Sequence, residues 1–345
     1  MKTEFLYKLL ESSAVSGWEA PLQRVVLAEM ENAADQIFVD GNGSVAAVIN
    51  PDAPVKVLLD GHADEVGLVV TCANEQGLLH VAKAGGPRLH CWPGQKVRIF
   101  TEKGMLYGAV AFTDAARKED LQARDLLIDI GVDSRQQAEE LVHTGDTVVL
   151  DTDWRMLQGD RICSRALDDK AGVFVVMEAL KRAREKGCTA GVYAVSATGE
   201  ETTKRGASWM AGSLWPDMAI VVDVTYASDA PGTRDADSGR VKLGGGPVLC
   251  CGGIISRPLN RLLEQAAEAC GIAVQHEVST ARTFTDADVI QPKRAGIPVA
   301  LVSIPLRYMH SPAEVGSLTD LEQCIELIAA FLCQLSGPVE LNPLA

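Results

Sequence analysis

Two short polar clusters contain the residue types that metal-assisted hydrolysis requires. His62 and Asp64 are separated by one residue, and Glu200 and Glu201 are adjacent. Residues i and i+2 of an extended segment project to the same side, so Asp64 could accept the second ring N–H of His62 and orient the ring for a metal ion. Adjacent glutamates suit a division of labour in which one ligates a metal while its neighbour takes a proton from bound water.

Three further clusters add potential metal ligands. They contain Asp168 with Asp169, Asp223, and His310. Two histidines, three or more carboxylates and no pair of cysteine ligands are typical of a hydrolytic zinc, cobalt or manganese centre and not of a structural zinc site. Asp223 directly follows the apolar run 218–222, where a buried charge must be paired or metal-bound.

Each cluster also has a purely structural explanation. His62 alone could be a hydrogen-bonded histidine of a loop or core. Asp168 and Asp169 could cap a helix, because carboxylates favour helix N-termini. Glu200 and Glu201 could lie on solvated surface. The metal hypothesis therefore depends on the clusters occurring together.

Apolar runs precede four of the clusters and predict the strands that position them. They occupy residues 55–59, 192–197, 218–222 and 299–304. Their lack of alternation is typical of buried parallel strands. Helical stripes recur at residues 171–185, 259–267 and 321–335, and Thr319 with Glu322 predicts a capping box at the start of the last. This alternation predicts an α/β sheet covered on both faces, with a ligand at the carboxyl ends of its strands.

The stretch from residue 71 to residue 158 has a different pattern. Short, glycine-punctuated strands are predicted at residues 97–100, 106–112, 126–130 and 147–150, and Ser134 with Gln137 marks the start of one helix. We expect an inserted β domain at 71–158 that divides a catalytic domain into parts 1–70 and 159–345.

Composition narrows the possible partners. The 345 residues include 32 Lys and Arg against 46 Asp and Glu, a net charge of −14, which argues against nucleic acid and anionic membranes. No apolar run approaches the ~20 residues of a bilayer span, and Glu4 and Lys8 interrupt any signal-peptide core. The nine cysteines include no C-x-x-C pair, which favours reduced thiols and a cytoplasmic location.

Other catalytic signatures are missing from the sequence. It contains no G-x-S-x-G elbow, no P-loop and no H-E-x-x-H motif; His276 and Glu277 lack the second histidine. The glycine-rich residues 41–46 look like a dinucleotide fingerprint, but they precede the strand-like run 45–49 and not a helix. We therefore expect a hairpin turn there.

Taken in order along the chain, the clusters resemble the motifs of the tetrahedral (TET), FrvX-like dinuclear aminopeptidases, which include glutamyl, leucyl and lysyl enzymes. The matching strings lie at residues 16–19, 61–67, 129–134, 165–172, 199–201, 222–225, 285–288 and 307–312. The resemblance covers nearly the whole chain.

The resemblance implies a role for each site residue. Two divalent ions, zinc or cobalt, would be bound by five ligands: His62, Asp168, Glu201, Asp223 and His310. Asp168 would bridge the ions, His62 and Asp223 completing one site and Glu201 and His310 the other. Glu200 would act as general base, and Asp64 would orient His62. Asp286 and Arg307 lie near the predicted site loops and are assigned to substrate binding.

The resemblance also implies a fold and partners. We expect a three-layer α/β/α, phosphorylase/hydrolase-like catalytic domain with an inserted, small β-barrel-like domain that helps to assemble subunits. The expected substrates are peptides with a free N-terminus, and the expected assembly is a homo-oligomer such as a tetrahedral dodecamer.

Three departures from the family pattern leave specificity and assembly open. Phe284 stands where many relatives have glycine, Tyr226 stands where they often have histidine, and residues 113–124 differ from the usual insertion. The same metal ligands would also serve a deacylase or a dipeptidase. A non-catalytic, metal-stabilised assembly is the remaining alternative, but it would have no use for a free glutamate at Glu200.

Overall fold

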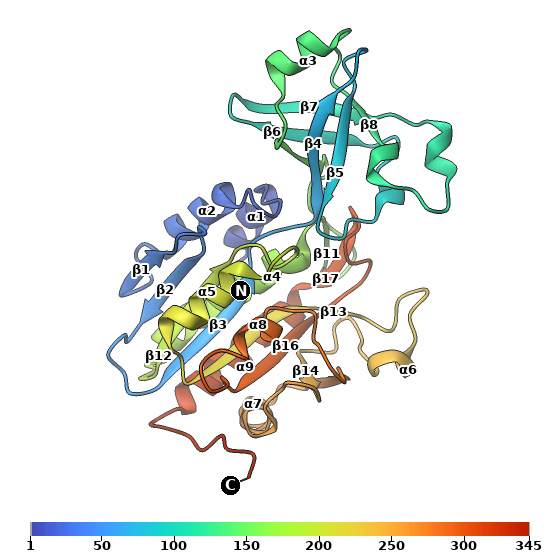
Figure 1. The fold of residues 1–345 in the computed structure, drawn as a ribbon. Helices are drawn as coiled ribbons and strands as arrows, with labels where there is room; N and C mark the ends of the chain where they lie inside the picture. Colours follow the sequence, from blue (N-terminus) through green and yellow to red (C-terminus); the bar gives the residue numbers. More distant parts are fainter. Residues whose placement is uncertain (1, 345) are drawn as a thin grey trace.

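The computed structural model describes residues 2–344, whose largest element is an eight-stranded sheet in the order β1-β2-β12-β3-β13-β16-β14-β15 (Figure 1). Its strands are β1 (Gln36–Val39), β2 (Val45–Ile49), β3 (Lys56–His62), β12 (Gly191–Ala197), β13 (Met218–Tyr226), β14 (Val248–Cys251), β15 (Gln275–Val278) and β16 (Val299–Leu306).

The four predicted core strands lie side by side. β12, β3, β13 and β16 pair in parallel, so their carboxyl ends meet at one edge of the sheet. Every residue of β12 and β16 is buried, which explains why these segments are apolar throughout and do not alternate. The strand prediction is confirmed.

Helices cover both faces of this sheet. One face packs against α1 (Glu4–Glu11), α2 (Ala20–Met30), α4 (Leu167–Glu185), α7 (Arg257–Cys270) and α9 (Leu318–Gln334), and the other against α5 (Arg205–Leu214) and α8 (Ala287–Ile290). The short helix α6 (Asp235–Ser238) lies in the connection between β13 and β14. Alternate residues of each strand enter the two cores; in β3, Val57 and Leu59 face one core and Leu58 the other. The three-layer α/β/α prediction is confirmed.

A closed β-barrel projects from one end of the catalytic domain (Figure 1). Its strands, in barrel order, are β4 (Gly67–Ala73), β5 (Leu79–Ala84), β8 (Leu127–Asp129), β7 (Gly104–Val110), β6 (Lys96–Thr101) and β9 (Thr147–Leu150). It also contains α3 (Arg135–Leu141) and three short 3₁₀ helices: Leu89–Cys91, Asp114–Arg117 and Ala123–Asp125. The barrel has its own apolar core, separate from the two cores of the sheet. The predicted β-barrel-like insertion is confirmed.

A small three-stranded sheet connects the barrel to the catalytic domain. It consists of β10 (Arg155–Met156), β11 (Arg161–Ser164) and β17 (Glu314–Ser317). β11 leads directly into α4, and β17 leads directly into α9. This sheet therefore fixes the chain immediately before Asp168 and immediately after His310.

Two local predictions are confirmed and one is wrong. Residues 41–43 form the turn of the β1–β2 hairpin, with Gly43 at φ 86°, and Ser134 caps α3 by accepting from the Gln137 N–H. The capping box of α9 does not form at Thr319, because Ser317 is the N-cap and accepts from the Asp320 N–H. The Thr319 N–H instead donates to Asp160 across the molecule.

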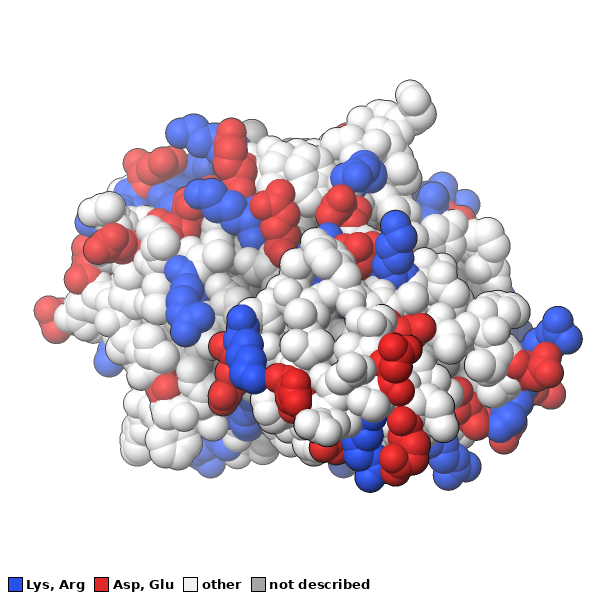
Figure 2. Space-filling model, turned by 90° about the horizontal axis from the view of Figure 1, so that it is seen from above, with Lys and Arg blue, Asp and Glu red and all other residues white. Residues whose placement is uncertain are grey.

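None of the helices within residues 2–344 is long and apolar enough to cross a bilayer. On the face shown in Figure 2, Lys and Arg side chains are interspersed with Asp and Glu side chains, and the described residues form no continuous basic area there.

Candidate active site

The structure brings the predicted catalytic and metal-binding residues together at the carboxyl ends of the parallel strands. His62 ends β3, and Asp223 lies in β13. The remaining members follow strands or begin a helix: Asp168, Glu200, Glu201 and His310. Residues as far apart in sequence as His62 and His310 thus contribute to one cluster, as expected for an open parallel sheet.

Asp168 lies at the centre of this cluster. Its Oδ1 is 3.2 Å from Nε2 of His62, and its Oδ2 is 3.1 Å from Nε2 of His310. His310 Nε2 is also 3.3 Å from Oε1 of Glu201, while His62 Nε2 is 4.0 Å from Oδ1 of Asp223. The two oxygens of one carboxylate therefore face two separate groups of potential ligands.

Burial and neighbouring charges shift the pKa values of the side chains in this cluster. Burial raises the pKa of Asp223 to about 7. Burial opposes protonation of His310, but Asp168 and Glu201 outweigh it and raise the pKa to about 11. Burial likewise disfavours ionised Asp168, yet hydrogen bonds from His310 and His62 hold its pKa well below the ordinary range. A bound cation would relieve this crowding.

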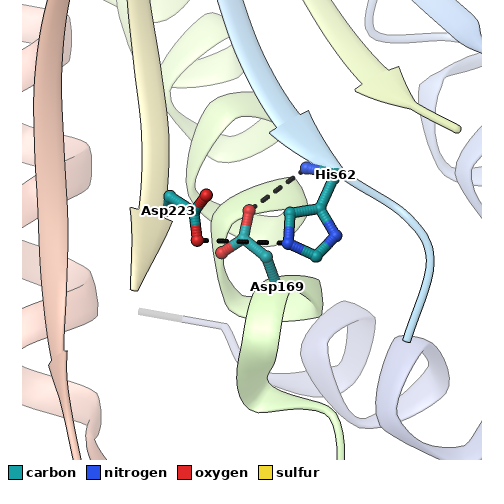
Figure 3. A group of neighbouring side chains, drawn as sticks. All are labelled: His62, Asp169 and Asp223. Atoms are coloured by element: carbon teal, nitrogen blue, oxygen red, sulfur yellow. Dashed lines mark hydrogen bonds and ion pairs between the residues drawn. The ribbon is translucent and has the colours of Figure 1, made fainter. Parts of the chain in front are cut away.

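Asp169 belongs to the cluster as well, although the family resemblance assigned it no role. Its carboxylate accepts from the backbone N–H of His62 at 3.1 Å and from that of Gly172 at 3.0 Å. Ligand atoms of His62, Asp169 and Asp223 lie within 4.8 Å of one another (Figure 3). Gly172 permits this packing, because a Cβ there would overlap the Asp169 carboxylate.

Asp64 has two kinds of contact in the site. Its backbone oxygen is 3.0 Å from Nδ1 of His62, and its carboxylate Oδ1 is 3.5 Å from the same nitrogen. The carboxylate also accepts from the backbone N–H groups of Glu200 at 2.9 Å and Glu201 at 3.1 Å. Asp64 thus holds the imidazole mainly through its backbone oxygen and the glutamate pair through its carboxylate. The sequence spacing suggested a contact between the carboxylate and the imidazole, and it gave no sign of the contacts to the glutamate pair.

Glu200 is buried beside the cluster and has a cationic neighbour that the sequence did not indicate. Its Oε2 is 4.0 Å from Nε2 of His62, and its Oε1 forms an ion pair with Lys204. Lys204 also donates to the backbone oxygen of Phe284 at 2.8 Å. The i, i+4 spacing of Glu200 and Lys204 was the available signal, but on a helix it is common on any surface.

Glu314 is a further positioning residue that the sequence did not single out. It is buried in β17, and its carboxylate accepts from the backbone N–H of Asp168 at 3.1 Å and from that of His310 at 2.7 Å. Both of these residues are predicted metal ligands. The small sheet therefore aligns the two segments that carry them.

A buried ion-pair network lies next to the end of β3, the strand that carries His62. Glu65 forms ion pairs with both Arg165 and Lys170, and Lys170 is fully buried. Burial works against ionised Glu65, but the two cations lower its pKa to about 2. Burial lowers the pKa of Lys170 to about 8, with Glu65 opposing that shift. The network joins the segment after β3 to the start of α4.

The two residues assigned to substrate binding lie away from the cavity lining. Asp286 is buried, and neither of its carboxylate oxygens has a hydrogen-bond partner among the described residues. Arg307 pairs with Asp229 at 2.8 Å and 3.1 Å. Arg307 does not reach the metal-ligand cluster, whereas, in addition to burial, the charges of His62 and Asp64 act on the Asp286 carboxyl group and alter its pKa.

A cavity of about 470 Å³ opens beside the cluster. The lining residues outside the cluster include Thr225, Tyr226, Glu277, Phe284 and Met309. Tyr226 and Phe284 are exposed at its mouth, so the two departures from the family pattern both border this cavity. Its size suits a side chain together with the adjoining peptide group.

The donor set fits divalent metal ions. Imidazole nitrogens and carboxylate oxygens converge in two groups, one containing His62, Asp169 and Asp223 and the other His62, Asp168 and Glu201. Hydrolytic zinc and cobalt sites use these ligand types. The fold and this site define the class: a three-layer α/β protein with a buried cluster of potential metal ligands at the carboxyl ends of its parallel strands.

Comparison with known proteins identifies the family. The family model described as M42 glutamyl aminopeptidase matches residues 43–327. The chain therefore belongs to the M42 peptidase family.

Relatives cover nearly the full length of the chain. It is 32% identical to a lysyl aminopeptidase of Pyrococcus furiosus, over 99% of both chains. A TET aminopeptidase from a marine-sediment Thaumarchaeota archaeon superposes with a TM-score of 0.90 at 33% identity, covering 96% of each chain. The TET1 peptidase of Pyrococcus horikoshii, described as assembling into a tetrahedron or a large octahedral shell, has a TM-score of 0.86 at 30% identity, covering 96% of this chain and 99% of its own.

Proposed function

We propose that this protein is a metal-dependent aminopeptidase that releases the N-terminal residue of peptides at a centre of two divalent ions. The observation that carries the proposal is the position of Asp168, whose two carboxylate oxygens face His62 and His310 separately. A carboxylate so placed can bridge two ions, with Asp223 and Glu201 as the outer ligands. Membership of the M42 family supports the peptidase activity.

The chain's own residues would perform the proton transfers. When bound, the metal ions would polarise the scissile carbonyl and lower the pKa of water toward about 7. Glu200 would take the proton of the attacking water and deliver it to the leaving amine, because it lines the cavity and lies beside His62. Lys204 would hold the Glu200 carboxylate in place, and Asp64 would hold its backbone.

Several further properties belong to the same proposal. We propose zinc or cobalt as the metal, a cytoplasmic location, and a homo-oligomer in which the barrel contributes to assembly. The shell-forming Pyrococcus horikoshii peptidase supports the last point, and a tetrahedral dodecamer is the assembly we expect. The division into residues 1–70, 71–158 and 159–345 remains a prediction.

The test compares metal content with turnover. Chelator-stripped protein should regain hydrolysis of aminoacyl substrates with Zn²⁺ or Co²⁺. Glu200→Gln should retain both metals and lose about 10²–10⁴-fold in kcat, whereas Asp168→Ala should lose metal from both positions. Wild-type turnover by the Glu200 variant would refute the general-base role. Two retained ions in the Asp168 variant would refute the bridge. Activity only on N-acyl amino acids or dipeptides would favour a deacylase or a dipeptidase.

A further inference from the structure

A buried carboxyl group in the cavity wall has no part in the proposed chemistry. Glu277 lies in β15, is 8% exposed and lines the same cavity as His62 and Glu200. Its Oε1 accepts from the hydroxyl of Ser303 at 2.6 Å, and its Oε2 accepts from the hydroxyl of Thr225. Both partners are neutral.

Glu277 differs in this respect from Glu65. Glu65 is also buried, but two basic side chains neutralise it. Among residues 2–344, no basic side chain lies within salt-bridge distance of Glu277, and burial raises its pKa while the two hydroxyls lower it. A buried carboxyl without a cation is costly for the fold, so a cavity-facing one points to a cation supplied by a ligand.

The position of Glu277 relative to the metal-ligand cluster indicates where the cation of a bound substrate would lie. Asp223 and Thr225 are two residues apart in β13, so their side chains share one face and lie about 6.6 Å apart along the strand. The Thr225 hydroxyl contacts Glu277. The carboxyl group therefore lies beyond the metal-ligand cluster by roughly the reach of one long side chain. A lysine, with its four-carbon stem, has that reach.

The cavity mouth suits the apolar part of such a side chain. Phe284 is 79% exposed and Tyr226 is 46% exposed, and both line the cavity with Met309. Aromatic and thioether groups can cover the methylene stem of a lysine or arginine while its charged end reaches a carboxylate.

We propose that Glu277 selects substrates whose N-terminal residue is basic, lysine or arginine, by pairing with the side-chain cation. The inference rests on the proposed aminopeptidase function and adds its substrate class. Thr225 and Ser303 are positioning residues that hold the carboxylate toward the cavity. Glu277 itself binds the substrate side chain and takes no part in the bond cleavage.

The first experiment measures charge recognition at a constant side-chain length. Metal-loaded protein is assayed on matched lysyl and norleucyl substrates, which share a four-carbon stem and differ in the terminal ammonium. The wild type should favour lysine, and Glu277→Gln should lower the lysyl-to-norleucyl ratio of kcat/KM by roughly 10-fold or more. Glu277→Asp should recover part of the ratio. Glu264→Gln is the matched control and should leave the ratio unchanged, because Glu264 is a partly exposed glutamate of α7 that pairs with His276, the neighbour of Glu277 in β15.

A second measurement separates failure of this inference from failure of the proposed function. Calorimetric titration with free L-lysine and L-norleucine reports recognition without turnover. If no aminoacyl substrate is hydrolysed but lysine binds in a Glu277-dependent manner, the aminopeptidase proposal fails and the cation site stands. Hydrolysis with equal preference for both substrates, a preference for leucyl or glutamyl substrates, or a ratio unchanged in Glu277→Gln would overturn the inference. Absence of both turnover and lysine binding would overturn it as well.

Discussion

Replacing Asp64 with asparagine tests how the site is held together. The Asp64 carboxylate is fully buried and accepts from the backbone N–H groups of Glu200 and Glu201 at 2.9 Å and 3.1 Å. Asparagine has nearly the same shape but offers one acceptor oxygen, so its amide group must face one of these N–H donors. One of the two hydrogen bonds is therefore lost without a change in volume.

The size of the effect follows from the bonds involved. A hydrogen bond to a charged group contributes about 1.5–3 kcal/mol, and the loss of one should lower the free energy of unfolding by that amount. The same change displaces the backbone that carries Glu200. Because residues that support metal ligands typically affect activity by about 10–100-fold, we expect Asp64→Asn to lower kcat by that factor at saturating metal.

The assay combines three measurements on purified protein. Mass spectrometry gives the metal content, hydrolysis of an aminoacyl substrate gives kcat, and urea titration gives the free energy of unfolding. Asp52→Asn is the control, because Asp52 is exposed in the turn between β2 and β3 and should leave all three values unchanged. A variant at Asp64 with wild-type kcat and stability would refute the claim that this carboxylate holds the catalytic backbone.

The remaining predictions concern the surroundings of the site. Glu65→Gln should cost about 3–5 kcal/mol in urea unfolding, because Arg165 and Lys170 would remain buried without their partner. Since the folded pKa of Glu65 is about 2 against an ordinary 4.5, its contribution is complete above pH 4.5 and is lost as the pH falls toward 2; equal acid sensitivity of wild type and variant would contradict this. Gly172→Ala should displace the Asp169 carboxylate and weaken metal affinity in a competition titration, and unchanged affinity would show that Asp169 does not shape the site.

Sequence reasoning succeeded where local patterns and topology were sufficient. The apolar runs at residues 55–59 and 218–222 predicted strands that the structure contains, and parallel strands bring the ends that carry His62 and Asp223 to one edge. The barrel could be predicted because its short strands and glycine turns contrast with the flanking α/β pattern. Neither prediction required knowledge of a contact between distant side chains.

Prediction from sequence failed where a contact joins residues that are far apart in the chain. Glu314 binds the backbone of Asp168, 146 positions away, and no spacing rule links them. The capping box at Thr319 is a valid local pattern, yet Asp160 takes the Thr319 N–H and Ser317 becomes the cap. Local sequence patterns therefore predicted the helices and strands. Hydrogen bonds between residues far apart in sequence determined which of the possible local contacts, such as the N-cap of α9, is formed.

The most direct test of the central claim is a metal titration of chelator-stripped protein, followed by release of the N-terminal residue from a peptide. The arrangement of Asp168 between His62 and His310 predicts no activity in the stripped protein and full activity at two equivalents of Zn²⁺ or Co²⁺ per chain. The same peptide with an acetylated N-terminus should not be cleaved. Activity that persists without metal, or that saturates at one equivalent, would contradict a dinuclear aminopeptidase.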